Sequence, residues 1–328
     1  MPKLKTGILL VGFGGPRSLG EVAPMLERIM RDAGTVPPAP RMEKIVQSAR
    51  AKYELIGGRS PIVDIAHNIC SGLQDALDQI DGGEGVHHVQ AGMMFSEPFL
   101  EAGLKRLADL GCERIIFLSM TAYESWAAWE GPYQRACVAA ENLGIKEVLR
   151  APVFGGDDAY LQAHADLLAK ALRDCEELRD TSLSYVAHSL PLEDPHEMAD
   201  SYRGQLEKAS HCVDRTVKDL LGRELPASAL SYVSLGARGG DWLRPSLKEH
   251  MQSLASSGTK TILVCPLGFA TDHMEVLYDL DIAAAKEAKG LGLRFVRTQT
   301  LATEEALHPA LIEALIVSVQ AAVRKSAF

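Results

Sequence analysis

Close pairs of cysteine are absent from this sequence. Its six cysteines are scattered along the chain, and no two of them have a CxxC-type spacing. Cys265 lies inside the apolar run ILVCPLG, as expected of a buried, reduced thiol in a cytosolic protein. Because the ligands of an iron–sulfur cluster usually include a close cysteine pair, the spacing argues against such a cluster.

Excess positive charge and long apolar runs are also missing. The formal net charge is −9, and no stretch interleaves basic with aromatic residues, so nucleic-acid binding is not expected. No segment reaches 18 uninterrupted apolar residues, and the apolar run in MPKLKTGILLVGFGG is too short for a signal peptide. These absences predict a cytoplasmic protein without a transmembrane segment.

Two signatures with fixed spacing are missing as well. The glycines around Phe13, in VGFGGPRS (Val11–Ser18), fit neither GxGxxG nor GxxxxGK[ST]. They indicate a tight turn or a close backbone approach to a flat ligand rather than a nucleotide loop. Ser189 stands beside His188, but no GxSxG nucleophile elbow occurs, so a serine hydrolase is disfavoured.

What the sequence does contain is an alternation of short apolar runs with longer helical patterns, in a chain of 328 residues. This alternation predicts βαβ units and parallel sheets, either as one eight-stranded barrel or as two open sheets of four strands. The expected strands are Gly7–Gly12, His88–Met94, Arg114–Ser119, Glu147–Val153, Leu183–Ala187, Leu230–Leu235, Thr261–Leu267 and Arg294–Thr298.

A weak internal repeat in the sequence favours two sheets over one barrel. Leu104–Met120 and Leu247–Gly268 both contain a helical pattern, a glycine-containing turn and a buried strand, at matching places in the two halves. We therefore expect a first α/β lobe over residues 1–150 and a second over residues 151–304. The helix expected at 305–328 would pack back on the first lobe.

Unusual residues follow three of the expected strands. In open parallel sheets, ligands bind beyond the carboxyl ends of the strands. Phe13 follows the first strand, His188 follows the fifth, and CPLGFATDHMEVLYDLD (Cys265–Asp281) contains the end of the seventh. A lone histidine in such a place often only hydrogen-bonds to backbone, but the turn residues Ser189 and Pro191 raise the odds of a functional role.

Glu275 has two interpretations. If Asp272 caps a helix, Glu275 is the third residue after this cap, and the two form a capping box. Asp279 would then lie on the same face and Asp281 would continue the acidic run. Because stacked carboxylates repel one another, this run favours a path for cations or protons, with a solvated acidic face as the alternative. His273 either joins that path or caps the helix.

Five segments, in this order, resemble the ferrochelatase family. GFATDHMEVLYDLD (Gly268–Asp281) resembles the family's long signature G-F-x-x-D-H-x-E-V-L-Y-D-x-D and is the most specific of them. The other four are KYELIGGRSP (Lys52–Pro61), VAHSLP (Val186–Pro191), GMMFSEPFLEAGL (Gly92–Leu104) and DWLRPSL (Asp241–Leu247).

The resemblance implies a fold of two Rossmann-like lobes, each a four-stranded parallel sheet flanked by helices, as in class II chelatases. It also implies insertion of Fe²⁺ into coproporphyrin III or protoporphyrin IX in haem synthesis, with His188 and Glu275 as the catalytic and metal-binding pair. His273, Asp279 and Asp281 would then form a metal or proton path. Iron is a substrate in this interpretation, and no tightly bound cofactor is expected.

Porphyrin contacts are expected from residues of the first lobe. These are Phe13, Arg31, Arg59, Ser60 and Tyr133, and Lys52 is a further cation for the propionates, because cationic groups suit carboxylates. Phe13 stands where many short bacterial members have a tyrosine, and Met93–Phe95 replace a segment that often carries Arg, Lys or His. The first-lobe wall is therefore expected to be apolar.

Other interpretations remain open at this stage. One is a related chelatase that inserts Co²⁺ or Ni²⁺ into a different tetrapyrrole, with His273 as its second histidine. Another is a porphyrin or haem carrier without catalysis. For the enzyme, a haem acceptor and an iron donor are the expected protein partners. The short spacing between the first two motifs favours coproporphyrin over protoporphyrin.

Overall fold

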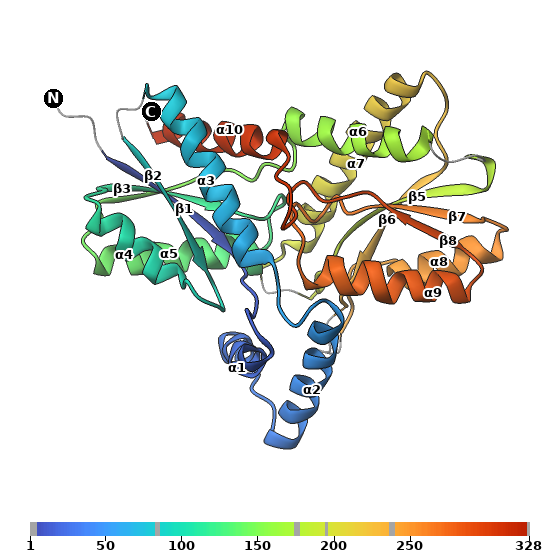
Figure 1. Ribbon diagram of the computed structural model, residues 1–328, viewed down its shortest axis with the longest axis horizontal. Coiled ribbons are helices and arrows are strands. Elements are labelled where there is room, and N and C mark those ends of the chain that lie inside the picture. The colour runs from blue at the N-terminus through green and yellow to red at the C-terminus, as the bar shows by residue number, and fades with distance from the viewer. Residues whose placement is uncertain (1–4, 83–85, 174–177, 194–195, 236–239, 327–328) are drawn as a thin grey trace.

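Two parallel four-stranded sheets form the framework of the protein. The computed structural model describes residues 5–82, 86–173, 178–193, 196–235 and 240–326, and Figure 1 shows its two sheets side by side, each with helices on its faces. The strands of the first sheet are β1 (Thr6–Gly12), β2 (His87–Met93), β3 (Arg114–Ser119) and β4 (Glu147–Arg150). Those of the second are β5 (Thr181–His188), β6 (Ser228–Val233), β7 (Thr261–Cys265) and β8 (Arg294–Arg297).

The two sheets have the same topology. Their strand orders are β2-β1-β3-β4 and β6-β5-β7-β8, and every pair is parallel. The prediction of two open sheets is confirmed, and the barrel is excluded. Helices on both faces bury the sheets, which explains why β1 reads as a continuous apolar run rather than an alternating one.

Helices connect the strands and cover the sheets. In the first half they are α1 (Val22–Asp32), α2 (Ala39–Leu55), α3 (Ile62–Ile80), α4 (Leu100–Asp109) and α5 (Gly131–Asn142). In the second half they are α6 (Asp158–Arg173), α7 (Ala199–Leu221), α8 (Leu247–Ser256), α9 (Ala285–Gly290) and α10 (Pro309–Ser326). Two π-helices, η2 (Trp126–Glu130) and η4 (Glu275–Ala284), and two short 3₁₀ turns complete the connections.

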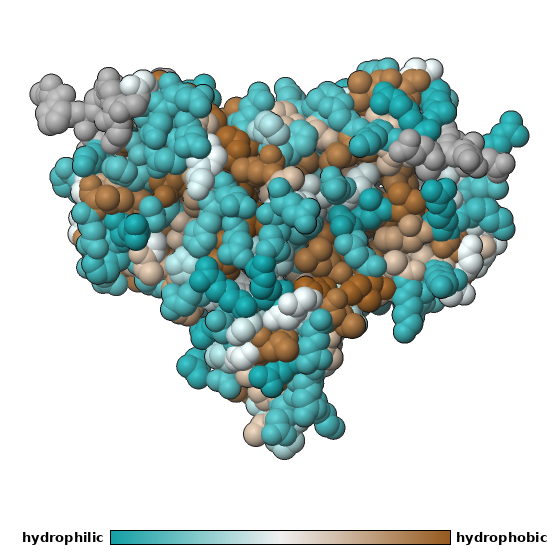
Figure 2. Space-filling view, viewed as in Figure 1, coloured by the Kyte–Doolittle hydropathy of each residue, from teal (hydrophilic) through white to brown (hydrophobic). Residues whose placement is uncertain are grey.

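A helical arm formed by α1 and α2 projects from the body of the protein (Figure 1). It lies between β1 and α3 in the chain, and Pro37 and Pro38 come directly before the start of α2. The C-terminal half of α2 returns to the second lobe and contacts η4. Figure 2 shows apolar surface gathered beside this junction of the arm with the second lobe.

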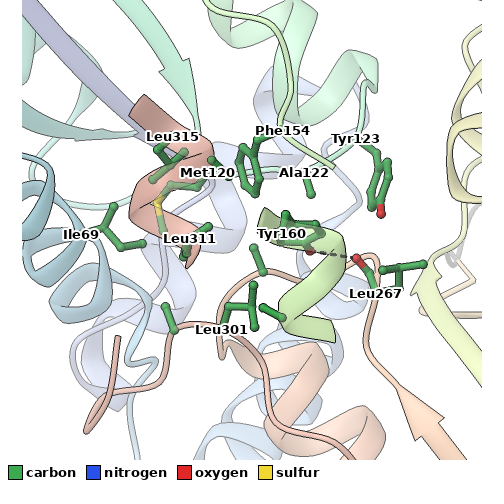
Figure 3. Close-up of a cluster of buried hydrophobic side chains, with 14 of the residues drawn as sticks. Ile69, Met120, Ala122, Tyr123, Phe154, Tyr160, Leu267, Leu301, Leu311 and Leu315 are labelled. Carbon is green, nitrogen blue, oxygen red and sulfur yellow. Dashed lines mark hydrogen bonds between the residues drawn. The ribbon is translucent and has the colours of Figure 1, made fainter. Parts of the chain in front are cut away.

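One hydrophobic core extends through both halves. It includes Ile8 and Leu10 of the first sheet together with Leu183 and Leu263 of the second, all inaccessible to solvent. Figure 3 shows how side chains from α6, α10 and both lobes meet in it. Because the lobes share a close-packed interior, the strand ends of the two sheets are held in fixed relative positions.

The C-terminal helix α10 takes part in this shared core. Leu311, Leu315 and Val319 are buried along one of its faces. The helix contacts α3, β3 and β4 of the first half and α6 of the second. It therefore packs across both halves of the molecule.

His164 gives the fold a pH dependence that can be measured. It is fully buried in α6, and burial lowers its pKa from 6.5 to about 3. In the unfolded chain the ring takes up a proton below pH 6.5, whereas in the folded protein it stays neutral, so stability falls as the pH drops from 6.5 toward 3. Between pH 7 and pH 5 this histidine is expected to cost about 2 kcal/mol of unfolding free energy.

Urea denaturation at several pH values tests this prediction. The variant His164→Gln should lose most of the slope of unfolding free energy against pH in this interval. The control His67→Gln, which changes an exposed histidine of α3, should retain it. An unchanged slope in His164→Gln would contradict the prediction.

The structure also bears on the membrane and cysteine expectations. No helix among the described residues is long and apolar enough to cross a membrane. Cys70, Cys112, Cys137, Cys212 and Cys265 are free thiols, and Cys175 lies outside the described residues.

Candidate active site

His188 and the segment leading to Glu275 leave neighbouring strands of the second sheet. In the order β6-β5-β7-β8, the chain continues from β5 to β6 on one side and later to β7 on the other. This reversal is a topological switch point, where open α/β sheets bind their ligands. His188 is the last residue of β5, and Cys265, the last residue of β7, begins the segment that leads to Glu275.

Gly268 brings that segment across the end of β5. Its backbone N–H donates to the carbonyl oxygen of Val186 at 3.0 Å. A side chain at this position would place its Cβ only 2.6 Å from Cα of Ala187, a distance that real Cβ atoms do not show. Only glycine therefore allows the loop to rest on the strand, one residue before His188.

The variant Gly268→Ala tests this close approach. The added methyl group must push the loop away from Ala187, and we expect a loss of about 2 kcal/mol in unfolding free energy, measured by urea denaturation. The matched control is Gly204→Ala, because Gly204 lies in α7 with open space around its missing side chain. That control should be stabilising, since alanine is the better helix former. A neutral Gly268→Ala would contradict the tight crossing.

Glu275 is an ionised carboxylate in contact with His273. Nδ1 of His273 lies 2.8 Å from its Oε2. Burial by itself would raise the pKa of Glu275, but the charges of His273 and His188 outweigh burial and lower that pKa to about 2. His188 contributes to this lowering through its charge when it is protonated, and the loop that leads to Glu275 rests on the residue before His188.

The orientation of His188 follows from its backbone contact. Nδ1 lies 2.6 Å from the carbonyl oxygen of Ser189, which can only accept a hydrogen bond, so Nδ1–H is the donor. When the ring is neutral, its lone pair therefore lies on Nε2. Nε2 is the atom of this side chain that can take up a proton or bind a metal ion.

The interpretation of Asp272 and Glu275 as a capping box is wrong. Asp272 accepts a hydrogen bond from Oγ1 of Thr300 at 2.7 Å instead of capping a helix. The helix that follows is a π-helix, it begins at Glu275, and Met274 precedes it without a side-chain cap. π-Helical segments are frequent at functional sites, and this one begins with Glu275.

The three acidic residues of η4 have different partners. Oδ2 of Asp279 accepts a hydrogen bond from Ser234 at 2.6 Å, and its Oδ1 lies 3.6 Å from Nζ of Lys52. Asp281 forms a two-pronged ion pair with Arg297, at 2.5 and 2.7 Å. Glu275 thus faces the histidines, Asp279 faces the arm, and Asp281 is tied to β8.

Tyr53 is a residue of this site that the sequence did not single out. It lies near the end of α2, it is buried, and both burial and the charge of Glu275 raise the pKa of its hydroxyl. The adjacent Lys52 stands 5.0 Å from the ring centre of Tyr278 on η4. The end of the arm is therefore part of the wall around Glu275. The only sequence signal was the position of Tyr53 within KYELIGGRSP.

Phe13 and Ser60 lie at the end of β1 in the first lobe. Phe13 follows β1 directly and is 40% exposed, with its ring centre 4.7 Å from that of Phe95. Ser60 is buried against Gly15, and its backbone N–H donates to the carbonyl of Pro16 at 2.8 Å. The first-lobe wall accordingly presents an aromatic surface at Phe13 and Phe95.

The other expected porphyrin contacts lie elsewhere or are already paired. Arg59 forms ion pairs with Asp64 and Glu304. Arg31 is exposed on α1. Tyr133 packs in the first lobe with its ring centre 5.5 Å from that of Phe117, next to Arg150. The structure does not bring these three residues together with His188 and Glu275, and their role stays a prediction.

The described residues hold no group of three or more His, Cys, Asp or Glu side chains arranged to bind a metal ion by themselves. The arrangement they do offer is a base on one side chain and a fixed negative charge on another. Such a pair suits a reaction in which protons leave one ligand while a cation enters it.

Comparisons with known proteins identify the family of the chain. The sequence pattern of the ferrochelatase family matches residues 5–321. A protein of Geobacter sp. (strain M21) named ferrochelatase is 30% identical over 309 residues, covering 90% of this chain and 93% of its own. A protein of Mycolicibacterium smegmatis named coproporphyrin III ferrochelatase is also 30% identical over 309 residues, covering 89% and 84%.

The solved structures support the fold. SirB from Bacillus subtilis, in a structure with Fe³⁺, superposes with a TM-score of 0.58 at 12% sequence identity. The match covers 99% of this chain and 98% of that one. This similarity confirms the two-lobed chelatase-like α/β architecture that the strand pattern and the family resemblance predicted.

Proposed function

The chain belongs to the ferrochelatase family, and we propose that it inserts Fe²⁺ into a porphyrin at a centre formed by His188 and Glu275. The observation that carries the proposal is the crossing of Gly268 over Ala187, which brings the segment leading to Glu275 onto the strand end that carries His188. Both residues belong to segments that leave the two strands flanking the switch point of the second sheet. The family and the geometry therefore indicate the same reaction.

His188 and Glu275 have different roles in the proposed reaction. A porphyrin that takes up Fe²⁺ releases two pyrrole N–H protons, so charge balances when both leave. Nε2 of a neutral His188 serves as the base that accepts one of these protons, since an imidazole is a good base near neutral pH, and the other proton passes to solvent water. Glu275, with its pKa lowered to about 2, keeps its negative charge and attracts the incoming cation. His273, in contact with Glu275, holds that carboxylate in place.

Phe13 and Phe95 provide an apolar surface for the macrocycle. Their rings pack against each other at the end of β1, and the exposed part of Phe13 can lie against a flat aromatic ligand. A phenyl ring cannot bind iron. In this proposal the metal therefore approaches from the side of His188 and Glu275, and the first lobe contributes shape rather than a ligand.

Iron delivery and propionate binding use charges farther from this centre. Asp279, the next acidic residue after Glu275 along η4, lies 3.6 Å from Lys52 of the arm, whereas both oxygens of Asp281 are held by Arg297. Arg31 and Arg59 remain the proposed partners of the propionates, although Arg59 must first leave Asp64 and Glu304. Iron is a substrate, no tightly held cofactor is proposed, and a haem acceptor and an iron donor are the proposed protein partners in the cytoplasm.

Coproporphyrin III is the proposed porphyrin, with support from the relative of Mycolicibacterium smegmatis that is named for it. The test is the initial rate of Fe²⁺ insertion by the purified protein, under anaerobic conditions, with coproporphyrin III and protoporphyrin IX side by side. The proposal expects insertion into both or one of them, and faster insertion into coproporphyrin III. Faster insertion into protoporphyrin IX would overturn the substrate choice. No iron insertion into either, together with Co²⁺ insertion into sirohydrochlorin, would overturn the assignment of the reaction.

A further inference from the structure

Two fully buried side chains of α6 hold the start of the loop that carries Glu275. Tyr160 and His164 are one helical turn apart, so they share a face of the helix, and neither is accessible to solvent. The hydroxyl of Tyr160 donates to the carbonyl oxygen of Leu267 at 3.0 Å, as Figure 3 shows. Nδ1 of His164 lies 3.6 Å from Sγ of Cys265, at the end of β7.

Burial determines the chemistry of the second contact. It lowers the pKa of His164 to about 3 and raises the pKa of the Cys265 thiol to about 12. At neutral pH both groups are uncharged, and the thiol can donate to Nδ1 of the imidazole. The two contacts of α6 are thus neutral and lie in the shared core, where water does not compete with them.

The segment held by α6 leads directly to the catalytic loop. Gly268, the residue after Leu267, rests on Ala187 beside His188. Farther on, Leu301 donates to the carbonyl of Ala270 at 3.1 Å, and Asp272 donates to the carbonyl of Ala302 at 2.9 Å. The loop is therefore anchored at its start by Tyr160, on β5 by Gly268, and near Glu275 by residues 301–302.

Helix α6 is itself firmly placed. It packs against α7 and α10, and α10 contacts the first sheet. The hydrogen bond from α6 to Leu267 consequently fixes the start of the loop relative to the whole shared core, and not only relative to one neighbouring strand.

We infer that Tyr160 is a positioning residue for the iron-insertion reaction: its hydroxyl fixes Leu267 and so determines where Glu275 stands relative to His188. The inference rests on the proposed function. Without the hydroxyl, the buried carbonyl of Leu267 loses its partner, and the loop has one anchor fewer between α6 and Glu275. Displacements of about 1 Å at a reacting group are enough to slow catalysis strongly.

The experiment compares Tyr160→Phe with Tyr123→Phe. Tyr123 is a matched control, since it is also buried in the shared core and its hydroxyl donates to a backbone carbonyl, that of Gly155 at 3.3 Å. Gly155 lies outside the loop from Leu267 to Glu275. Each variant removes one buried hydroxyl, so a similar fall in melting temperature is expected of both.

Two readouts separate positioning from a general loss of stability. Amide hydrogen exchange over residues 268–276 should become about tenfold faster in Tyr160→Phe only. The kcat for Fe²⁺ insertion should fall about tenfold in the same variant, with the KM for the porphyrin unchanged. Tyr123→Phe should alter neither.

Equal exchange in the two variants, or a wild-type kcat in Tyr160→Phe, would overturn the inference. If the wild type inserts no iron, the proposed function fails and with it the link to catalysis. The exchange comparison would then still decide whether Tyr160 holds the loop, so the two failures can be told apart.

Discussion

Replacement of His188 by alanine is expected to lower the kcat of Fe²⁺ insertion by about 10²- to 10⁴-fold, the usual contribution of a general base. The reason is the position of Nε2, which carries the lone pair because Nδ1 donates to the carbonyl of Ser189. Porphyrin binding, measured by quenching of porphyrin fluorescence, should change little, because the apolar wall at Phe13 and Phe95 is untouched.

The control for this prediction is His67→Ala, which removes an exposed histidine of α3 and should leave kcat unchanged. Turnover by His188→Ala at the wild-type rate would contradict the catalytic role. A wild type that binds porphyrin but never turns over would favour the carrier interpretation instead.

The variant Glu275→Gln should also lower kcat strongly, by about 10²-fold. Glutamine keeps the shape of the side chain and removes only its charge. Because His273 and His188 hold the pKa of Glu275 at about 2, the wild-type carboxylate is ionised throughout the working pH range. The loss should therefore appear at every pH at which the enzyme is active.

The accompanying measurement is the rate of insertion at increasing Fe²⁺ concentrations, which gives the KM for Fe²⁺. If Glu275 attracts the cation, the KM for Fe²⁺ should rise in Glu275→Gln while the KM for the porphyrin stays the same. Glu287→Gln is a suitable control, since Glu287 lies in α9, which continues η4, and pairs with Lys248 at 3.0 Å on the surface. Equal kinetics of the two variants would contradict the role of Glu275.

The sequence predicted the sheets well because their signal is local. Each strand is a short apolar run, such as TGILLVG in β1, and the second half of the chain repeats the pattern of the first. The strand pattern also placed His188 and the segment with Glu275 at one sheet edge, whereas the choice of these two as the active pair came from the resemblance to the ferrochelatase family. His188 ends one strand and Glu275 follows another, and the carboxyl ends of parallel strands share one edge of a sheet.

What the sequence could not predict depends on contacts between distant segments. The first turn of a π-helix contains the same residues as an α-helix or a capping box, so the start of η4 at Glu275 was not foreseen. The ion pair of Arg59 with Glu304 joins residues from opposite halves of the chain. The roles of Tyr53 and Tyr160 likewise depend on how α2 and α6 pack.

A double-variant cycle tests the central claim, that His188 and Glu275 act at one centre. The measurement is the rate of Fe²⁺ insertion into coproporphyrin III by the wild type, His188→Ala, Glu275→Gln and the protein with both changes. Groups that serve the same step lose activity together, so the double variant should be no more than about threefold slower than the slower single variant. Losses that multiply would show that the two residues act independently and would contradict a shared centre.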